Sequence, residues 1–363
     1  MDRNLPLGIA CFCILLTLVS FGSVRPTQAA PLVTSVQGTL MDNGVIVIQG
    51  SNFGSKPAGS MLIWDSMESG RFQPDWSETW SRINSDNNRH PRSRYNAKGS
   101  FSSPSSLQGF NGGTDSPKWF VQYWFKLGTD WTWGTGDTGV SPVSNVKFFR
   151  LWTTGSDAIN YVQAWHTFLN QTSTIYGVEN GSGLVYDSGN AHPYTNPYNI
   201  PKNTWVLFQW QFSDGDVNAS NGTVKWWING KLAISKNNLM TRSSSGGTNY
   251  KRVSLAGFYN SWGNSPNSTA YIDDVYVANS WARVELGNAP TYDACTLREI
   301  QIPSVWTGTA ITIRLNQGAF PDFQSPYLYV VDESGAVNPS GFSLSGTPPV
   351  PKIPEAPFAI SIN

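Results

Sequence analysis

Three short stretches of the sequence contain all three of its histidines, each beside residues that can take part in acid–base chemistry. They are NNRHPRSRY (87–95), VQAWH (162–166) and AHPYTNPYN (191–199). Cleavage of a uronate-containing glycan by β-elimination needs a base such as histidine or tyrosine, and a cation or amide that neutralises the carboxylate. If the chain is such a lyase, the catalytic candidates are His90, Arg92, Arg94, His166 and Tyr194.

The pattern of these stretches leaves other interpretations open. Gln163 and His166 are three residues apart, so a regular strand would point them to opposite faces. The arginines of 89–98 could instead belong to a solvated loop and pair with nearby acidic residues, because surface ion pairs are common and individually weak. Zinc is not indicated, since no two histidines have the spacing of metal ligands.

Tryptophan is the other residue type that points to a ligand. Of the 16 tryptophans, 15 lie between Trp64 and Trp281, and most of them must fill a core. The stretch GTDWTWGTGDTG (128–139) has the composition of a loop, where tryptophans suit stacking on sugar rings; covering the end of a core is the alternative. The predicted ligand-binding residues are Trp131, Trp133, Trp152, Gln163, Trp165 and His192.

Composition narrows the class of partner. Lys+Arg 24 balances Asp+Glu 24 and charged residues make up 13% of the chain, whereas proteins that hold nucleic acid or a bilayer surface usually carry a basic excess.

Residues 1–29 have the basic start, apolar run and small-residue end of a signal peptide, which predicts a secreted, extracellular or periplasmic protein. After its removal Cys295 is the only cysteine, so no internal disulfide is expected.

The elements that must position these residues are strands. Alternating or two-faced apolar runs, such as KWFVQYWFKL (118–127) and TWVLFQWQF (204–212), recur between Gly, Asn and Pro, and helical periodicity is almost absent. In TVKWWING (223–230), strand alternation sends Trp226 and Trp227 to opposite faces, and Asn229-Gly230 predicts a two-residue hairpin turn. The fold class is therefore all-β, with sheets covered on both sides.

Two family resemblances refine this prediction. LIWDSMESGRF (62–72), KGSFSSPSSLQGF (98–110) and AYIDDVYVA (270–278) are similar to strands of a concanavalin A-like lectin/glucanase jelly roll. PLVTSVQGTLMDNGVIVIQGSNFGSKPAG (31–59) resembles the opening of an IPT/TIG domain, an immunoglobulin-like β-sandwich, whose missing strands appear after residue 297. The resemblances imply an immunoglobulin-like domain at 30–62 and 297–346 that is split by an inserted jelly roll at 63–286, with two tandem units and a short N-terminal arm as the alternative. The signal peptide at 1–29 precedes them, and a proline-rich tail follows at 347–363.

The jelly-roll resemblance also bears on metals and hydrolysis. First and last strands are neighbours in that architecture, so Glu68, Asp273 and Asp274 could converge on a structural Ca²⁺. In the alternative, Asp273 caps backbone amides and Asp274 faces water on the other side of the strand. The sequence lacks the Glu-x-Asp-x-x-Glu triplet of the glucanase branch, so glycoside hydrolysis is not indicated.

Three functions follow as hypotheses. The first is a lectin-like protein that binds an extracellular polysaccharide through an aromatic-lined concave face. The second is a polysaccharide lyase that acts by β-elimination on a uronate-containing glycan. The third is a non-catalytic adhesion module whose immunoglobulin-like part docks to another protein. A nucleic-acid partner or insertion into a membrane is not expected.

Overall fold

The chain was analysed as a computed structural model, which describes residues 29–79, 81–100, 108–130, 144–153, 161–169, 173–180, 185–186, 200–241, 250–261 and 269–345. These residues form strands joined by turns and loops, with one short 3-10 helix at Tyr292–Ala294 and no α-helix. The described part of the chain thus holds no helical segment with the length and hydropathy of a membrane span. The prediction of an all-β fold is confirmed.

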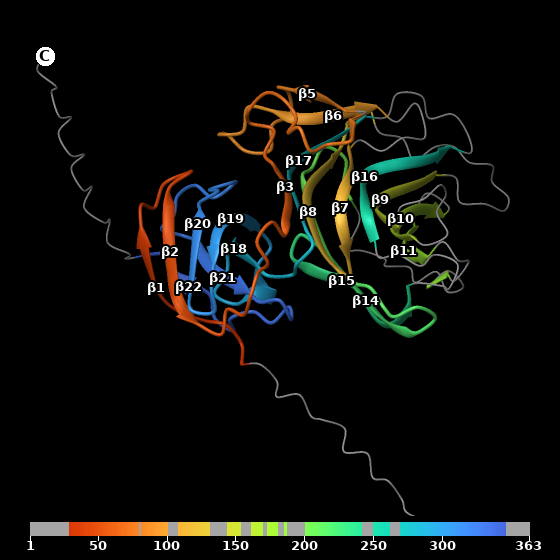
Figure 1. Ribbon diagram of the computed structural model, residues 1–363. Coiled ribbons are helices and arrows are strands. Elements are labelled where there is room, and N and C mark those ends of the chain that lie inside the picture. The colour runs from red at the N-terminus through yellow and green to blue at the C-terminus, as the bar shows by residue number, and fades with distance from the viewer. Residues whose placement is uncertain are drawn as a thin grey trace, which may run out of the picture.

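The described strands form three sheets, which lie as layers in Figure 1. The outer sheet contains, in spatial order, β12 (Val185–Tyr186), β11 (Ser173–Asn180), β10 (Tyr161–Leu169), β9 (Ser144–Thr153), β16 (Tyr250–Ser261), β7 (Gln108–Ser116) and β4 (Glu78–Thr79). The middle sheet contains β15 (Lys231–Met240), β14 (Ser220–Ile228), β13 (Val206–Ser213), β8 (Lys118–Leu127), β17 (Thr269–Ala278), β6 (Asn96–Ser100) and β5 (Arg82–Asn84), with β3 (Met61–Asp65) paired to β17.

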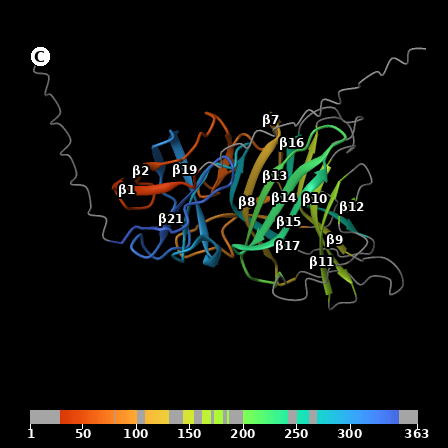
Figure 2. The ribbon, with the colours of Figure 1, turned by 90° about the horizontal axis from the view of Figure 1, so that it is seen from below.

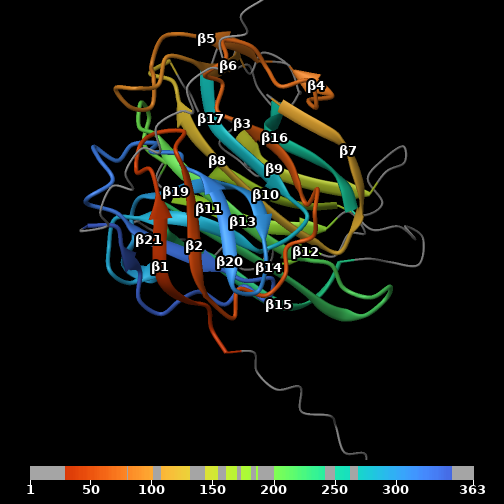
Figure 3. The ribbon, with the colours of Figure 1, turned by 60° about the vertical axis from the view of Figure 1, so that its left-hand side comes forward.

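The third sheet is built from strands near both ends of the described chain, and we call it the terminal sandwich. Its order is β1 (Leu32–Gly38), β2 (Val45–Ser51), β20 (Ala310–Arg314), β19 (Arg298–Trp306), β18 (Arg283–Gly287), β21 (Tyr327–Val331) and β22 (Phe342–Ser343). Figure 3 shows β1, β2 and β20 side by side at the front of the molecule.

Strand β19 folds this sheet onto itself. Its first half pairs with β18 and its second half with β20, with a register irregularity between Pro303 and Val305. The two halves then pack face to face, and Ile46 and Ile313 of one half share a buried cluster with Val284 and Leu328 of the other. The terminal sandwich therefore has its own apolar core.

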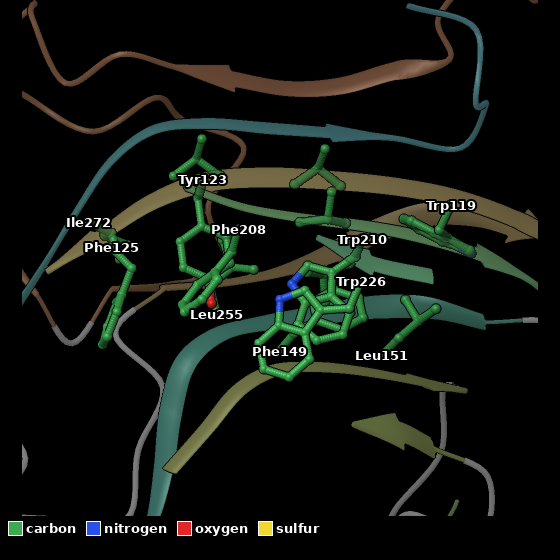
Figure 4. Packing of buried hydrophobic residues seen from close by; sticks show 14 of the residues in the cluster. Trp119, Tyr123, Phe125, Phe149, Leu151, Phe208, Trp210, Trp226, Leu255 and Ile272 are labelled. Carbon is green, nitrogen blue, oxygen red and sulfur yellow. The ribbon is translucent and has the colours of Figure 1, made fainter. Parts of the chain in front are cut away.

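A second, larger core lies between the middle and outer sheets. Figure 4 shows Trp210 and Trp226 of the middle sheet facing Phe149 of the outer sheet. The Trp210 and Trp226 rings stack with centroids 4.2 Å apart, and the Phe149 ring stacks on Trp210 at 5.1 Å. Offset aromatic stacks of this kind add specific geometry to the burial of a large apolar area.

The tryptophan pair of β14 divides as strand alternation requires. Trp226 is fully buried in this core, whereas Trp227 is half-buried on the other face. The hairpin turn that follows has positive φ at both Asn229 (48°) and Gly230 (74°), as a type I′ turn needs. Both sequence predictions for this hairpin are confirmed.

The middle sheet is buried on both faces, which explains the two-faced apolar runs. Trp119 and Tyr123 of β8 point into the core shared with the outer sheet. Phe120, on the opposite face of β8, packs with Tyr276 of β17 against Ile300 of the terminal sandwich. Figure 2 shows β8, β13 and β14 between the terminal sandwich and β9, β10 and β11. We call the contact between the middle sheet and the terminal sandwich the junction.

Candidate functional site

The predicted site residues fall into two separate places in the described structure. Trp152 lies on β9 and Gln163, Trp165 and His166 lie on β10, all in the outer sheet. Glu68, His90, Arg92, Arg94 and Asp274 lie together at the junction, beyond the middle sheet. Trp131, Trp133, His192 and Tyr194 lie outside the described residues. The first two histidine stretches therefore do not meet in one groove.

One face of the outer sheet packs against the middle sheet and forms part of the larger core. We call the opposite face of the outer sheet the distal face. On β9, Phe149 and Leu151 are buried in the core, so strand alternation places Arg150 between them on the distal face. The central place of β9 in the sheet leaves Arg150 flanked by strands on both sides, and the residue is 8% exposed. A buried guanidinium at the centre of a sheet face is the cation that carboxylate recognition requires.

The register of the neighbouring strands places a polar row across Arg150. Gln163 of β10 is its partner on one side and Ser254 of β16 its partner on the other. Gln163 is paired in turn with Glu179 of β11. In the adjacent row, Trp152 pairs with Tyr161. The outer sheet thus brings a guanidinium, an amide and aromatic residue types to neighbouring positions.

His166 has a different place in this register. It pairs with Val146 of β9 and Tyr176 of β11, three positions along β10 from Gln163. Trp165 pairs with Lys147 after an irregularity that follows Ala164. His166 is two residues from Ala164 on β10, so strand alternation assigns both positions to the same face of the sheet. Ala164 is paired with the core residue Phe149, which makes this the core face. The strand therefore does not bring the His166 position to the Arg150 row.

At the junction, the central feature is a buried arginine that the sequence analysis did not single out. The side chain of Arg89 is 1% exposed and its Nη1 lies 2.6 Å from Glu299 Oε1 of the terminal sandwich. Its Nη2 pairs with Asp274 and its Nε lies 4.0 Å from Asp273. Its guanidinium carbon lies 4.6 Å from the ring centroid of Trp124. Arg89 therefore ties the middle sheet to the terminal sandwich.

The acidic doublet on β17 differs from its prediction. A regular strand would send Asp273 and Asp274 to opposite faces, but both carboxylates approach Arg89. The reason is an irregularity in the pairing of β17 with β8 after Asp273, where Asp274 takes a left-handed φ of 46°. Burial raises the pKa of Asp274 to about 7, although Arg89 acts in the opposite direction. Burial also raises the pKa of Asp273.

The loop that carries His90, Arg92 and Arg94 is held by local hydrogen bonds. Both Glu68 oxygens accept the Arg94 backbone N–H at 3.0 Å. The His90 Nδ1 accepts the backbone N–H groups of Arg92 (3.2 Å) and Ser93 (3.1 Å). The Arg92 Nη2 donates to the carbonyls of Gly318 and Phe320 in the terminal sandwich. The predicted basic stretch is thus a bridge between the two parts of the molecule.

These hydrogen bonds determine which ring nitrogen of His90 carries the proton. Because Nδ1 accepts two hydrogen bonds, it carries no proton, and the single proton of the neutral ring lies on Nε2. Burial, together with the charges of Arg89 and Arg92, lowers the pKa of His90 to about 3. The ring is therefore neutral near pH 7 and offers an N–H donor, a state that suits hydrogen bonding rather than proton abstraction.

Beside this loop the junction contains a cavity of about 380 Å³, which we call the junction cavity. Its walls come from both parts of the molecule. The residues that line it are Asp42, Asn43, Trp64, Ser66, Glu68, His90, Arg92, Arg94, Asp274, Ile302, Arg314, Leu315, Asn316 and Gly318.

The three carboxylates of the predicted calcium site are engaged by protein groups. Glu68 accepts backbone amides, Asp274 binds Arg89, and Asp273 accepts the Asp274 N–H at 2.9 Å and the Ser93 hydroxyl at 3.3 Å. Across the described ranges, no group of three His, Cys, Asp or Glu side chains is arranged to hold a metal ion. The predicted neighbourhood of first and last strands does hold, because β3 pairs with β17.

Sequence reasoning missed Arg150, Arg314 and Trp64, and it considered Arg89 only as one arginine of the basic stretch. A signal for Arg150 was present in NVKFFRLW (145–152), where one arginine interrupts an apolar run at an alternating position. Arg314 interrupts AITIRLN (310–316) in the same way. No local signal marks Arg89, because its partners are Asp273, Asp274 and Glu299, far along the chain.

Comparisons with known proteins give similarity of fold only. No protein-family profile matches the sequence, and no curated protein matches it. Among solved structures, the chain is similar to the alginate lyase Aly36B (TM-score 0.43, 12% identity, 68% of this chain and 98% of that one). It is also similar to an endo-β-1,4-glucuronan lyase of the fungus Trichoderma reesei (0.39, 12%, 61% and 97%) and to the cellulose-induced protein Cip1 (0.37, 14%, 60% and 97%). At these values the likeness assigns neither a substrate nor a reaction to this chain.

Proposed function

We propose that this chain is a polysaccharide lyase that cleaves a uronate-containing glycan by β-elimination on the distal face of the outer sheet. One observation carries the proposal: Arg150 of β9 and Gln163 of β10 are paired positions near the centre of the outer sheet. The neighbours of Arg150 on β9, Phe149 and Leu151, belong to the core. A rigid sheet holds such groups more precisely than loops do.

The chemistry explains why this pair matters. In β-elimination a base takes the proton from the carbon next to the carboxylate, and the electrons of that C–H bond form a carbon–carbon double bond. The glycosidic C–O bond on the next carbon breaks, and its oxygen leaves with a proton. Negative charge develops on the carboxylate before that bond breaks, and a fixed guanidinium and amide stabilise it. We assign this role to Arg150 and Gln163.

The base is proposed to be a tyrosine. Tyr161 lies on β10 two positions from Gln163 and is paired with Trp152. Tyr194, predicted from the third histidine stretch, is the second candidate. A phenol has a high ordinary pKa, so a nearby guanidinium is needed to favour its ionised form. Arg150, beside Gln163 in the register, is such a cation.

Carbohydrate binding without cleavage is the second candidate function, on the same face. The positions of Trp152, Tyr161 and Trp165 beside the polar row favour it, because aromatic rings stack on the apolar faces of sugars. A lectin would use this row to hold a carboxylate without a base in reach of the sugar.

Turnover on defined polyuronates separates the two candidates. Polymannuronate, polyguluronate and polyglucuronate are incubated with the protein while the ultraviolet absorbance of the unsaturated product is followed. We expect one of them to be cleaved, and Arg150→Ala to lower kcat/KM by about 100-fold or more. Arg71→Ala, which removes an exposed arginine from the loop after β3, outside the strands of the outer sheet, is the matched control. Saturable binding by the wild type with no absorbance change on any polymer would favour the lectin.

Three further expectations complete the proposal. We infer from residues 1–29 that the protein is exported, which would bring it to extracellular glycans. The terminal sandwich is proposed to be an immunoglobulin-like domain, which the sequence resemblance to IPT/TIG domains supports. Its proposed role is to bind a protein partner. Ca²⁺ at Glu68, Asp273 and Asp274 stays a prediction, and no step of the proposed reaction uses it.

A further inference from the structure

We propose that the junction cavity is a second, non-catalytic binding site for a carboxylate-bearing sugar unit. It lies on the other side of the middle sheet from the outer sheet, and residues of the terminal sandwich form one of its walls. The proposal stands on the residues of this cavity and does not require the lyase reaction.

The acceptors of the cavity are already satisfied. Glu68 accepts two backbone amides, and Asp274 binds Arg89. The Asp42 carboxylate accepts the Gln317 backbone N–H at 3.0 Å and the Asn43 side-chain amide at 3.2 Å. The carboxylates that line the cavity are therefore engaged in holding its walls.

Some donors of the cavity have no partner within the protein and face the space that a ligand would fill. Within the described part of the chain, the Arg314 guanidinium has no ion pair or hydrogen bond, and the Ser66 hydroxyl has no hydrogen bond. The His90 Nε2–H, fixed by the two bonds to Nδ1, has none either among these residues. A cavity with spare donors and occupied acceptors is matched by a ligand rich in oxygen acceptors.

Charge and shape narrow the class of ligand. Of the arginines that line the cavity, Arg94 lies 3.8 Å from Glu68 and Arg92 donates to backbone carbonyls, so the exposed Arg314 is the cation left for a ligand carboxylate. Trp64 lines the same cavity and is half-buried, so part of its ring is available to an apolar ligand face. A volume of about 380 Å³ is within the range of pockets that hold small molecules. A pyranose ring with a carboxylate has all three properties.

The walls of the cavity are fixed before a ligand arrives. The Arg89 pairs with Asp274 and Glu299 join the two parts of the molecule beside the cavity. The bonds from Arg92 to the carbonyls of Gly318 and Phe320 close the same contact. A pre-organised site loses less entropy on binding than one that must be ordered by its ligand.

Calorimetric titration of three small probes tests this site. Sodium glucuronate carries the ring and the carboxylate, glucose carries the ring alone, and acetate carries the carboxylate alone. The titrations use the full chain with Arg150→Ala, so that the outer-sheet site contributes least. We expect saturable binding of glucuronate, with glucose and acetate each at least about tenfold weaker, which corresponds to about 1.4 kcal/mol.

Two variants and one control locate the binding. Arg314→Ala, added to the Arg150→Ala protein, should weaken glucuronate binding by about tenfold or more, because a charge-assisted hydrogen bond is lost. Ser66→Ala should weaken it a few-fold, in line with the loss of one neutral hydrogen bond. Arg71→Ala, an exposed arginine outside the cavity, should leave it unchanged.

The outcomes that overturn the proposal are equally specific. Acetate binding as tightly as glucuronate would make the cavity a simple anion site. Glucuronate binding that is unaffected by Arg314→Ala and Ser66→Ala, or no saturable binding at all, would also contradict it. Absence of polyuronate cleavage by the wild type would contradict the lyase and leave these titrations valid, so the two proposals fail separately.

Discussion

Both faces of the middle sheet are buried, but one face meets an aromatic core and the other meets a largely polar set of partners. Toward the outer sheet, Trp210 and Trp226 belong to an aromatic core. Toward the terminal sandwich, Gln209 donates to Gln122 at 2.9 Å and accepts from Arg298 at 3.2 Å. The same strands therefore carry an aromatic core on one side, and on the other a buried polar network beside the smaller apolar cluster of Phe120, Tyr276 and Ile300.

This difference shows how the fold separates packing from positioning. Apolar contacts are non-directional and tolerate small shifts of one sheet over the other. A buried polar network is stable only when each member meets its partner, so it allows one arrangement of the two layers. The Tyr292 hydroxyl, which donates to Glu285 at 2.6 Å, is part of that requirement in the terminal sandwich. We infer that the polar contacts of the junction fix the position of the terminal sandwich relative to the middle sheet.

The largest expected effect is in the aromatic core. Trp226→Ala removes a fully buried ring that stacks on Trp210, so we expect the free energy of unfolding to fall by about 4 kcal/mol. Trp227→Ala, at the next residue but half-buried on the other face, should cost less than half as much. Urea unfolding followed by circular dichroism measures both. Equal losses for the two variants would mean that the core does not distinguish the faces.

The junction should respond nearly as strongly to the loss of one charge. Arg89→Met leaves Asp273, Asp274 and Glu299 without their buried cation, and we expect a loss of about 3 kcal/mol, since a broken buried ion pair leaves uncompensated charge. Arg82→Met, an exposed arginine on β5, is the control and should change stability little. Thermal unfolding of both variants checks this. Similar stabilities would show that the Arg89 network does not hold the junction.

A medium effect is expected where the hairpin turn meets the terminal sandwich. Gly230 has a φ of 74°, and a Cβ at this position would lie 2.1 Å from the Cys295 carbonyl oxygen. Gly230→Ala should therefore lower stability by about 2 kcal/mol through backbone strain and this contact. Gly59→Ala is the matched control, because its φ of 71° is also left-handed but nothing lies within 4 Å of the added Cβ. The difference in unfolding free energy between the two variants measures the contact alone.

The smallest effect in the wild type is on the pH dependence of stability, because the contributions of two junction residues oppose each other. The folded-state pKa of Asp274 is raised from 3.8 to about 7, so its contribution to stability falls as pH rises through that window. The folded-state pKa of His90 is lowered from 6.5 to about 3, so its contribution is present above about pH 6.5 and is lost as pH falls toward 3.

Single variants should separate these slopes. In Asp274→Asn, stability should rise more steeply with pH between about 4 and 7 than in the wild type, by at most about 1.4 kcal/mol per pH unit. In His90→Asn the slope should change in the opposite direction. Urea unfolding at several pH values measures both. Parallel pH profiles for the wild type and the two variants would contradict the assignment.

The sequence could predict features that depend on near neighbours in the chain. The two-faced run at 118–127 indicated a strand buried on both sides, and Asn229-Gly230 indicated the turn, because alternation and turn chemistry are local. The acidic doublet was mispredicted because the irregularity after Asp273 depends on β8, more than a hundred residues earlier in the chain. Local patterns do not contain that partner.

The site shows the same limit more strongly. His90 and Gln163 looked like parts of one constellation because their residue types suit one reaction, but they lie in different layers. Which layer a strand joins is decided by pairing between distant parts of the chain, as with β16 beside β7 and β17 beside β3. Arg150 was recognisable only when Phe149 and Leu151 were known to face the core.

The most direct test of the proposed chemistry is the rate of unsaturated uronate formation by the wild type, Arg150→Ala and Arg71→Ala on the same polyuronate. The distal-face proposal predicts turnover by the wild type and by Arg71→Ala, and a loss of about 100-fold or more for Arg150→Ala when all three proteins are assayed well below their unfolding temperatures. Turnover by Arg150→Ala at the rate of the wild type would show that the reaction takes place away from Arg150 and would contradict the distal-face proposal. No turnover by any of the three proteins on any polyuronate would contradict the lyase itself.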